Sequence, residues 1–76
     1  MTRSHSDLAV VYSTLGDTLR AQDEDQSAIE AYTKALDLTV EGDPRAWFLY
    51  FSRGIARSQD GDSVGAEEDF RAALAI

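Results

Sequence analysis

The chain has 76 residues, of which 14 are acidic and 7 are basic, and its formal net charge at pH 7 is −7. This length allows one small domain over residues 1–76, which buries only about 60% of its unfolded surface. The acidic balance disfavours the phosphate backbone of nucleic acids. No apolar run approaches the roughly 20 residues that span a bilayer, there is no basic and apolar leader, and no cysteine can form a disulfide. We therefore expect no nucleic-acid partner and no membrane span. The compartment stays open, with the cytoplasm favoured.

A motif of five residues recurs with one fixed offset. Each member has a counterpart 38 positions later: Leu15, Gly16, Ala28, Tyr32 and Ala35 return as Arg53, Gly54, Ala66, Phe70 and Ala73. A constant period between about 20 and 50 residues indicates stacked supersecondary units. Within each unit, the 12 positions from the glycine to the first alanine suit a helix, a tight turn and a returning helix. We expect Gly16 to face Ala28 and Gly54 to face Ala66, with the aromatic residues filling the space beside them.

The first unit, about residues 7–40, reads as two helices. An apolar stripe at intervals of four, three and four predicts a first helix ending near position 21 or 22; its members are Leu8, Tyr12, Leu15 and Leu19. Ser4 with Asp7 three positions later resembles a capping box at its start. The acidic run 23–25 predicts the turn and the start of the second helix, because carboxylates accept hydrogen bonds from the free N–H groups there. The second helix is expected to fade near Val40.

A break separates the two units. It lies at residues 41–43, and the second unit follows at about 44–76. Gly42 suits a helix C-terminus, Asp43 suits an N-cap and Pro44 suits a first helical turn. We therefore expect a third helix that is capped by Asp43 and begins at Pro44.

The second unit also reads as two helices. Residues 47–51, Trp-Phe-Leu-Tyr-Phe, are apolar on every side of a helix, and such a helix is usually buried between neighbours. A turn at 59–62 leads into a fourth helix from about Ser63. Terminal units of helical arrays normally carry a polar outer face. Here the last turns are apolar and no polar cap is expected; the side chains concerned are Phe70, Ala73, Leu74 and Ile76.

These residues resemble the tetratricopeptide repeat, a family of stacked helical hairpins. The matching positions are Tyr12, Leu15, Gly16, Ala28, Tyr32 and Ala35 in the first unit, and Tyr50, Gly54, Gly61, Ala66, Phe70 and Ala73 in the second. The chain departs from the family pattern at Leu19, Asp23, Arg53 and Arg57. Its period is also about one helical turn longer than the family's period of about 34 residues. The resemblance implies an all-α fold of two stacked antiparallel hairpins in a right-handed solenoid, and the second unit looks like bacterial members.

The resemblance also implies a binding groove on the concave face, formed by the first helix of each unit. Its positions correspond to Val10, Ser13, Asp17, Arg20, Phe48, Phe51, Ile55 and Ser58. Members that clamp an acidic C-terminal peptide carry Lys and Asn at the positions of Ser13 and Asp17, so a clamp of that kind is not expected. Two interpretations of Phe48 and Phe51 stay open. They are either aromatic anchors for a partner's helix or peptide, or core residues, as aromatics at helical spacing usually are.

Residues that support catalysis or metal binding form no recognisable constellation. His5 is the single histidine, and without cysteines it cannot complete a zinc site. The acidic loops at 23–25 and 60–62 invite comparison with calcium loops. However, Lys34 and Arg71 occupy the closing position, where a bidentate carboxylate is required. We therefore expect no enzymatic activity, no cofactor and no metal, and we interpret the acidic residues as turn and cap residues.

The sequence thus predicts a protein–protein interaction or scaffolding module that binds a partner peptide or helix in the groove. The alternative is a structural self-assembly unit. In that case the apolar end of the fourth helix pairs with a second copy, or two chains exchange a hairpin at the long turn from Thr39 to Pro44. A monomer at high concentration would favour the free groove, and a homodimer would favour self-assembly.

Overall fold

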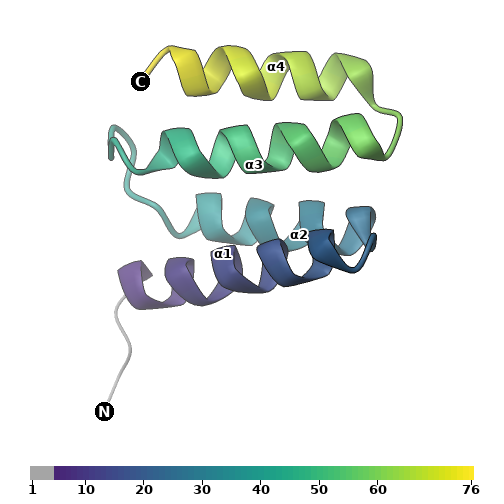
Figure 1. Cartoon of the computed structure of the whole chain (residues 1–76). Helices are drawn as coiled ribbons and strands as arrows, with labels where there is room; N and C mark the ends of the chain where they lie inside the picture. The colour runs from purple at the N-terminus through teal and green to yellow at the C-terminus, as the bar shows by residue number, and fades with distance from the viewer. Residues whose placement is uncertain (1–4) are drawn as a thin grey trace.

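The computed structural model describes residues 5–76, which form four α-helices and no strand. The helices are α1 (His5–Ala21), α2 (Asp25–Asp37), α3 (Ala46–Gln59) and α4 (Ser63–Leu74). Helix α1 packs along α2 and α3 along α4, which gives two helical hairpins, and α2 packs on α3 between them. Figure 1 shows the helices stacked in chain order, with α1 and α4 at the two ends. The predicted all-α fold of two stacked antiparallel hairpins is confirmed. The capping box expected at Ser4 lies outside the described residues.

The turns inside the two hairpins use the same backbone hydrogen bonds. In each turn an N–H reaches back to a carbonyl of the preceding helix: Glu24 N to Leu19 O at 2.9 Å, and Asp62 N to Arg57 O at 2.8 Å. This bond closes a helix end when the residue before the donor adopts the left-handed conformation. That residue is Gly61 in the second hairpin, with φ +87°, and Asp23 in the first, with φ +61°. Asp23 therefore adopts a backbone conformation that favours glycine.

The two returning helices are capped differently. Asp62 accepts a hydrogen bond from the N–H of Gly65 at 2.9 Å, which confirms the predicted carboxylate cap on α4. At α2 the N-cap residue is Glu24, whose side chain makes no capping hydrogen bond. The prediction of a carboxylate cap is wrong at Glu24, because Glu is not among the short side chains that cap well. The neighbouring Asp25 has one buried carboxylate oxygen without a hydrogen-bond partner.

Helix α2 ends earlier than predicted. Its last residue is Asp37 rather than a residue near Val40. The Thr39 hydroxyl donates to the Ala35 carbonyl at 2.7 Å, so a side chain satisfies a carbonyl of the last turn. Local side-chain hydrogen bonds of this kind compete with continuation of a helix. Gly42 has φ +84° but lies in the connection beyond the end of α2.

Helix α3 begins later than predicted. Its first residue is Ala46, so the prediction that Asp43 caps it is wrong. Asp43 instead accepts a hydrogen bond from the backbone N–H of Arg45 at 2.9 Å, and its two oxygens also accept from the Arg45 guanidinium. The carboxylate is thus occupied by a residue two positions along. A bond to the N–H two positions along is typical of an Asx turn, and here that turn ends at Arg45, directly before the first helical residue.

Each hairpin closes around a glycine and an aromatic ring. A Cβ atom at Gly16 would lie 2.7 Å from the Tyr32 ring, and one at Gly54 would lie 2.7 Å from the Phe70 ring. The aromatic residues thus pack beside the glycines as expected. That Gly16 faces Ala28 and Gly54 faces Ala66 stays a prediction. The glycine leaves a gap as wide as a side chain, which a flat ring fills. Ala28 lies fully buried in the same core.

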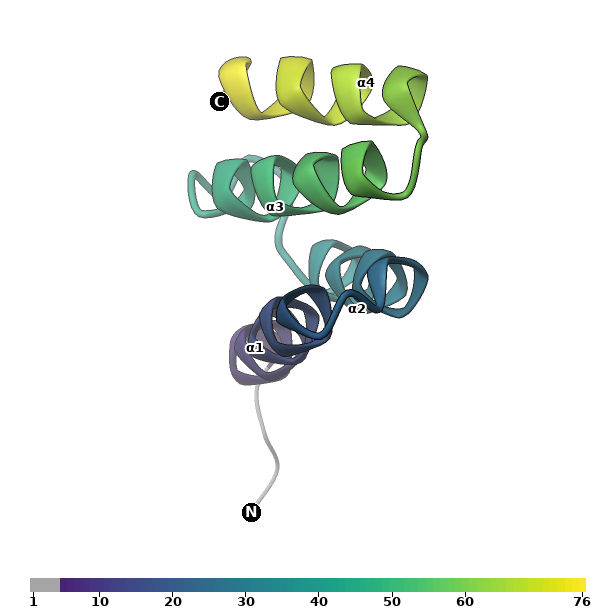
Figure 2. The ribbon, with the colours of Figure 1, turned by 45° about the vertical axis from the view of Figure 1, so that its right-hand side comes forward.

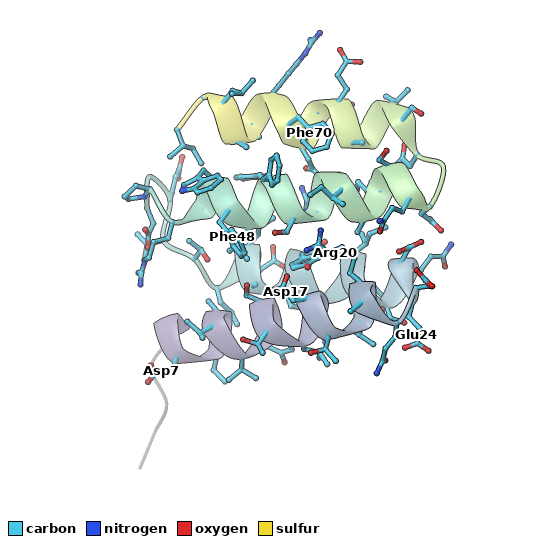
Figure 3. The ribbon with its side chains drawn as sticks, in the orientation of Figure 1. Asp7, Asp17, Arg20, Glu24, Phe48 and Phe70 are labelled. Carbon is cyan, nitrogen blue, oxygen red and sulfur yellow. The ribbon has the colours of Figure 1, made fainter. Side chains whose placement is uncertain are left out.

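The outer side of α4 is more polar than the sequence suggests. Figure 3 shows Phe70 on the side of α4 that faces α3. On the exposed side Glu67 and Arg71 form an ion pair at 2.5 Å. The apolar surface expected at the end of the chain is confirmed at Leu74 and Ile76, whereas Phe70 and Ala73 are partly buried. Apolar exposure concentrates at Leu74, which is 87% exposed, and at Ile76.

Candidate binding groove

A pocket opens on the side of the molecule that α1 and α3 share. These two helices touch only slightly, whereas α2 packs on both. Figure 2 shows α2 displaced to the right of α1 and α3. The pocket has a volume of about 400 Å³. It is lined by Ala9, Val10, Ser13 and Thr14 of α1, by Trp47, Phe48 and Leu49 of α3, and by Leu38, Thr39, Val40, Asp43 and Arg45 of the connection.

The wall formed by α3 is aromatic and open to solvent. The rings of Trp47 and Phe48 meet edge to face with centroids 6.0 Å apart, and Phe51 lies 6.3 Å from Trp47 and 5.7 Å from Phe70. We call these four residues the aromatic strip. Phe48 is 42% exposed and Phe51 is 44% exposed. The expectation that this helix is buried on all sides is therefore wrong. Its opposite face is buried, as Leu49, Ser52 and Ala56 show.

Three of the predicted groove residues line the pocket, namely Val10, Ser13 and Phe48. Figure 3 shows Phe48 extending from α3 toward the first hairpin. Phe51 lies on the aromatic strip but not in the pocket lining. The remaining predicted positions lie along the same helices outside the pocket lining; they are Asp17, Arg20, Ile55 and Ser58. The groove positions therefore separate into an apolar pocket at one end and a more polar stretch beyond it.

Asp17 belongs partly to the core rather than only to the groove. It accepts a hydrogen bond of 2.5 Å from the hydroxyl of the buried Tyr32, and Arg20 lies 3.8 Å from the same carboxylate. Figure 3 shows Asp17 and Arg20 close together on this side of the molecule. Burial raises the pKa of Tyr32 well above its ordinary value of 10.0, and the hydrogen bond to Asp17 raises it further.

Sequence reasoning missed the part of the pocket that the connection supplies. Arg45 and Asp43 form an ion pair at 2.7 Å at its edge, and Val40 lines it as well. The period of 38 residues could have indicated this contribution, because it exceeds the usual period of about 34. The additional residues of a unit must then lengthen a helix or a connection. Trp47 was also missed as a groove residue, since an all-apolar stretch does not reveal which side faces solvent.

The chemistry that the pocket offers is apolar contact with a few hydroxyl groups. Ser13, Thr14 and Thr39 supply the hydroxyls, and the charged pair at its edge is mutually neutralised. Within the described residues, no group of three or more His, Cys, Asp or Glu side chains could hold a metal ion. No helix in this part of the chain is both long and apolar enough to cross a bilayer. The side chain of His5 lies outside the described set.

Comparison with known proteins adds no relative. No family model, curated protein sequence or solved structure matches the chain. The tetratricopeptide resemblance therefore rests on the residues of this chain alone, and membership of that family and a right-handed solenoid stay predictions.

Proposed function

We propose that the chain is a protein–protein interaction module without catalysis of its own. It binds an apolar segment of a partner, a helix or an extended peptide, in the pocket between α1 and α3. The observation that supports this proposal best is the aromatic strip, in which Trp47, Phe48 and Phe51 are half-exposed beside an open pocket. Exposed apolar patches of this kind are characteristic of interaction sites. Buried aromatic anchors carry much of the energy of such interfaces.

The pocket also limits the chemistry of the partner. Its volume of about 400 Å³ lies within the range of sites that enclose a small ligand or a few side chains. The Ser13 hydroxyl can donate a hydrogen bond to a peptide carbonyl, whereas the Thr39 hydroxyl, which already donates to the Ala35 carbonyl, can accept one from a peptide N–H. Because Asp43 and Arg45 neutralise each other, the pocket selects for apolar side chains rather than for charge. We therefore propose a partner segment with two or three apolar anchors.

A selection from a random peptide display library against the full chain tests this proposal. Trp47 is the single tryptophan and lines the pocket, so its fluorescence reports on occupancy directly. Selected peptides should shift its emission to shorter wavelength. Phe48→Asp should weaken their binding by roughly tenfold or more, as expected for a hot-spot residue. Val64→Asp, at an exposed position on α4, is the matched control and should leave binding unchanged. Peptides that bind equally well to the Phe48→Asp variant would contradict the proposal.

Self-association is a second candidate function, favoured by the exposure of Leu74. This side chain is 87% exposed on α4, and Ile76 beside it is half-exposed. A two-fold interface pairs a patch with itself, so these residues could cover each other in a homodimer. Light scattering over a concentration series should then show a dimer that Leu74→Lys dissociates. A native chain that stays monomeric at about 1 mM would rule out this candidate.

A further inference from the structure

One face of α3 is buried against α2. The offset of 38 residues between the two units identifies the equivalent face of α1. Ala46, Leu49 and Ala56 on this face of α3 are buried, with Leu49 only 6% exposed. Arg53 on the same face donates a hydrogen bond to Thr33 of α2 at 3.2 Å. This face of α3 therefore forms the contact between the two hairpins.

The positions 38 residues earlier form a face of α1 that no described helix covers. We call it the α1 outer face; its members are Leu8, Val11, Leu15 and Thr18. Val11 is 44% exposed, Leu15 is 45% exposed and Thr18 is exposed as well, in contrast to the buried Leu49, whereas Leu8 is partly buried. None of the four is charged, and the Thr18 hydroxyl already donates to the Thr14 carbonyl at 3.1 Å. This is an apolar helix face without a partner inside the described chain.

We propose that the α1 outer face docks an amphipathic helix of a partner protein, and that this helix presents an uncharged aliphatic stripe like that of α2. The occupant follows from the interface between α2 and α3, which the same face of α3 already forms. On α2, Ile29 and Leu36 pack against the core cluster that includes Leu49 and Ala56 of α3, and Thr33 accepts the hydrogen bond from Arg53. These three residues follow one another at intervals of four and three positions. An uncharged face on α1 is complementary to an uncharged stripe of this kind, because no ion has to be desolvated.

A second copy of the chain fits this face less well. The helix equivalent to α2 is α4, and there the stripe consists of Glu67, Arg71 and Leu74. Glu67 and Arg71 form an ion pair at 2.5 Å, which would have to be desolvated against apolar side chains. We therefore assign this face to a helix that is not part of this sequence, rather than to α4 of a second copy. The surface is also separate from the pocket between α1 and α3, so the inference goes beyond the proposed function and does not depend on it.

To test this proposal, two residues of α4 are replaced so that α4 presents the same stripe of side chains as α2, and association is then measured. Glu67→Ile combined with Arg71→Thr reproduces the side chains of Ile29 and Thr33 and leaves the net charge at −7. In this double variant the α2-like stripe lies on α4 and the α1 outer face lies on α1, and these two helices are at opposite ends of the stack (Figure 1). It should therefore associate head to tail, a contact that forms chains rather than closed pairs. By light scattering its average mass should rise about twofold or more above that of the native chain at equal concentration.

Further variants place the contact on α1. Adding Val11→Asp, or separately Thr18→Arg, should return the mass of the double variant to that of the native chain, because both put a charge on the α1 outer face. The matched control is Glu68→Ile with Arg71→Thr, which has the same composition but places the isoleucine off the stripe. It should behave like the native chain. Far-ultraviolet circular dichroism verifies that every variant is helical. No rise in mass, an equal rise in the control, or a rise that both α1 variants leave intact would each overturn the proposal.

Discussion

Arg53 on α3 holds Asp69 on α4 through two parallel hydrogen bonds, Nε to Oδ2 at 2.9 Å and Nη2 to Oδ1 at 2.7 Å. Arg57 donates a third hydrogen bond to Oδ2 at 3.0 Å. Asp69 is 2% exposed, so the carboxylate has exchanged water for two guanidinium groups. Arg53 also reaches Thr33 on α2, and in this way the ion network of the second hairpin extends to the first.

The first hairpin has an apolar set at the same positions. The residues 38 positions before Arg53, Arg57 and Asp69 are Leu15, Leu19 and Ala31. At the neighbouring aromatic ring the first hairpin is the polar one. It has Tyr32 hydrogen-bonded to Asp17, whereas the second hairpin has the apolar Phe70 and Ile55 at the same positions. At these two sites each hairpin therefore has one set of polar residues and one set of apolar residues, and no set mixes polar with apolar side chains. A half-satisfied polar pair in a core would be destabilising.

Removing the carboxylate of this network should destabilise the fold severely. Asp69→Ala leaves two largely buried guanidinium groups without a carboxylate, and we expect the free energy of unfolding to fall by about 3 kcal/mol. The triple variant Arg53→Leu, Arg57→Leu and Asp69→Ala imports the apolar set of the first hairpin, and should recover most of this loss. Urea denaturation followed by circular dichroism measures both. A triple variant no more stable than Asp69→Ala would show that the two hairpins do not use equivalent sites.

Tyr32 should make the fold less stable in alkaline solution. In the unfolded chain it ionises near pH 10, whereas in the folded chain burial and the hydrogen bond to Asp17 raise its pKa. The folded state therefore retains a proton that the unfolded state loses. The contribution to stability is complete below about pH 10 and is lost as the pH rises from there through the folded pKa.

Two measurements check this expectation. In an ultraviolet titration, one of the three tyrosines should ionise only as the chain unfolds, and Tyr32→Phe should remove that late component. The free energy of unfolding of the native chain should also fall more steeply above about pH 10 than that of Tyr32→Phe. Equal pH dependence in the two proteins would mean that the Tyr32 hydroxyl ionises normally in the folded state.

The hairpins were predictable because their signals are local or periodic. The glycine and the ring that close each hairpin recur with the same offset, and Asp62 directly precedes the helix that it caps. The predictions of individual contacts failed where a side chain has a hydrogen-bond partner that the local sequence pattern does not indicate. Asp43 looked like an N-cap, but Arg45, two positions later, takes both its oxygens. Arg53 and Asp69 are sixteen positions apart, so the sequence shows an unusual Arg without identifying its partner.

The groove was predictable only in part. Val10, Ser13 and Phe48 lie together because the repeat places them on equivalent faces of α1 and α3. Which side of the apolar segment 47–51 faces solvent depends on where α2 and α4 pack, and the composition of the segment contains no such information. The rest of the pocket comes from the connection between the hairpins, where no helical periodicity guides the assignment.

Replacing Asp23 by Gly should stabilise the chain. Asp23 has φ +61° in a turn whose counterpart in the second hairpin has Gly61 at φ +87°. An L-residue pays a steric cost in this region that glycine does not. The gain is reduced by the larger entropy of glycine in the unfolded chain, so we expect about 0.5–1 kcal/mol. The reciprocal change Gly61→Asp should cost a similar amount in thermal denaturation. If Asp23→Gly were destabilising, the Asp side chain would have to contribute more than its backbone costs.

Gly54→Ala should destabilise the chain even though alanine is the better helix former. A methyl group there would lie 2.7 Å from the Phe70 ring and 3.2 Å from the Asp69 Cβ. The ring cannot move away freely, because Phe51 lies 5.7 Å from it on the other helix. Overpacking costs about 1–3 kcal/mol, and helix propensity returns about 1 kcal/mol. We therefore expect a net loss of about 1 kcal/mol.

A loss of this size should lower the melting temperature by about 4–8 °C in a domain of this length. The double-mutant cycle with Phe70→Leu separates the two contributions. In the Phe70→Leu background the ring that meets the new methyl group is absent, so Gly54→Ala should there become neutral or stabilising, because only the gain in helix propensity remains. If Gly54→Ala destabilised both backgrounds equally, the cost would arise from the α3 backbone or from Asp69, and the close contact between glycine and ring would not be what holds the second hairpin together.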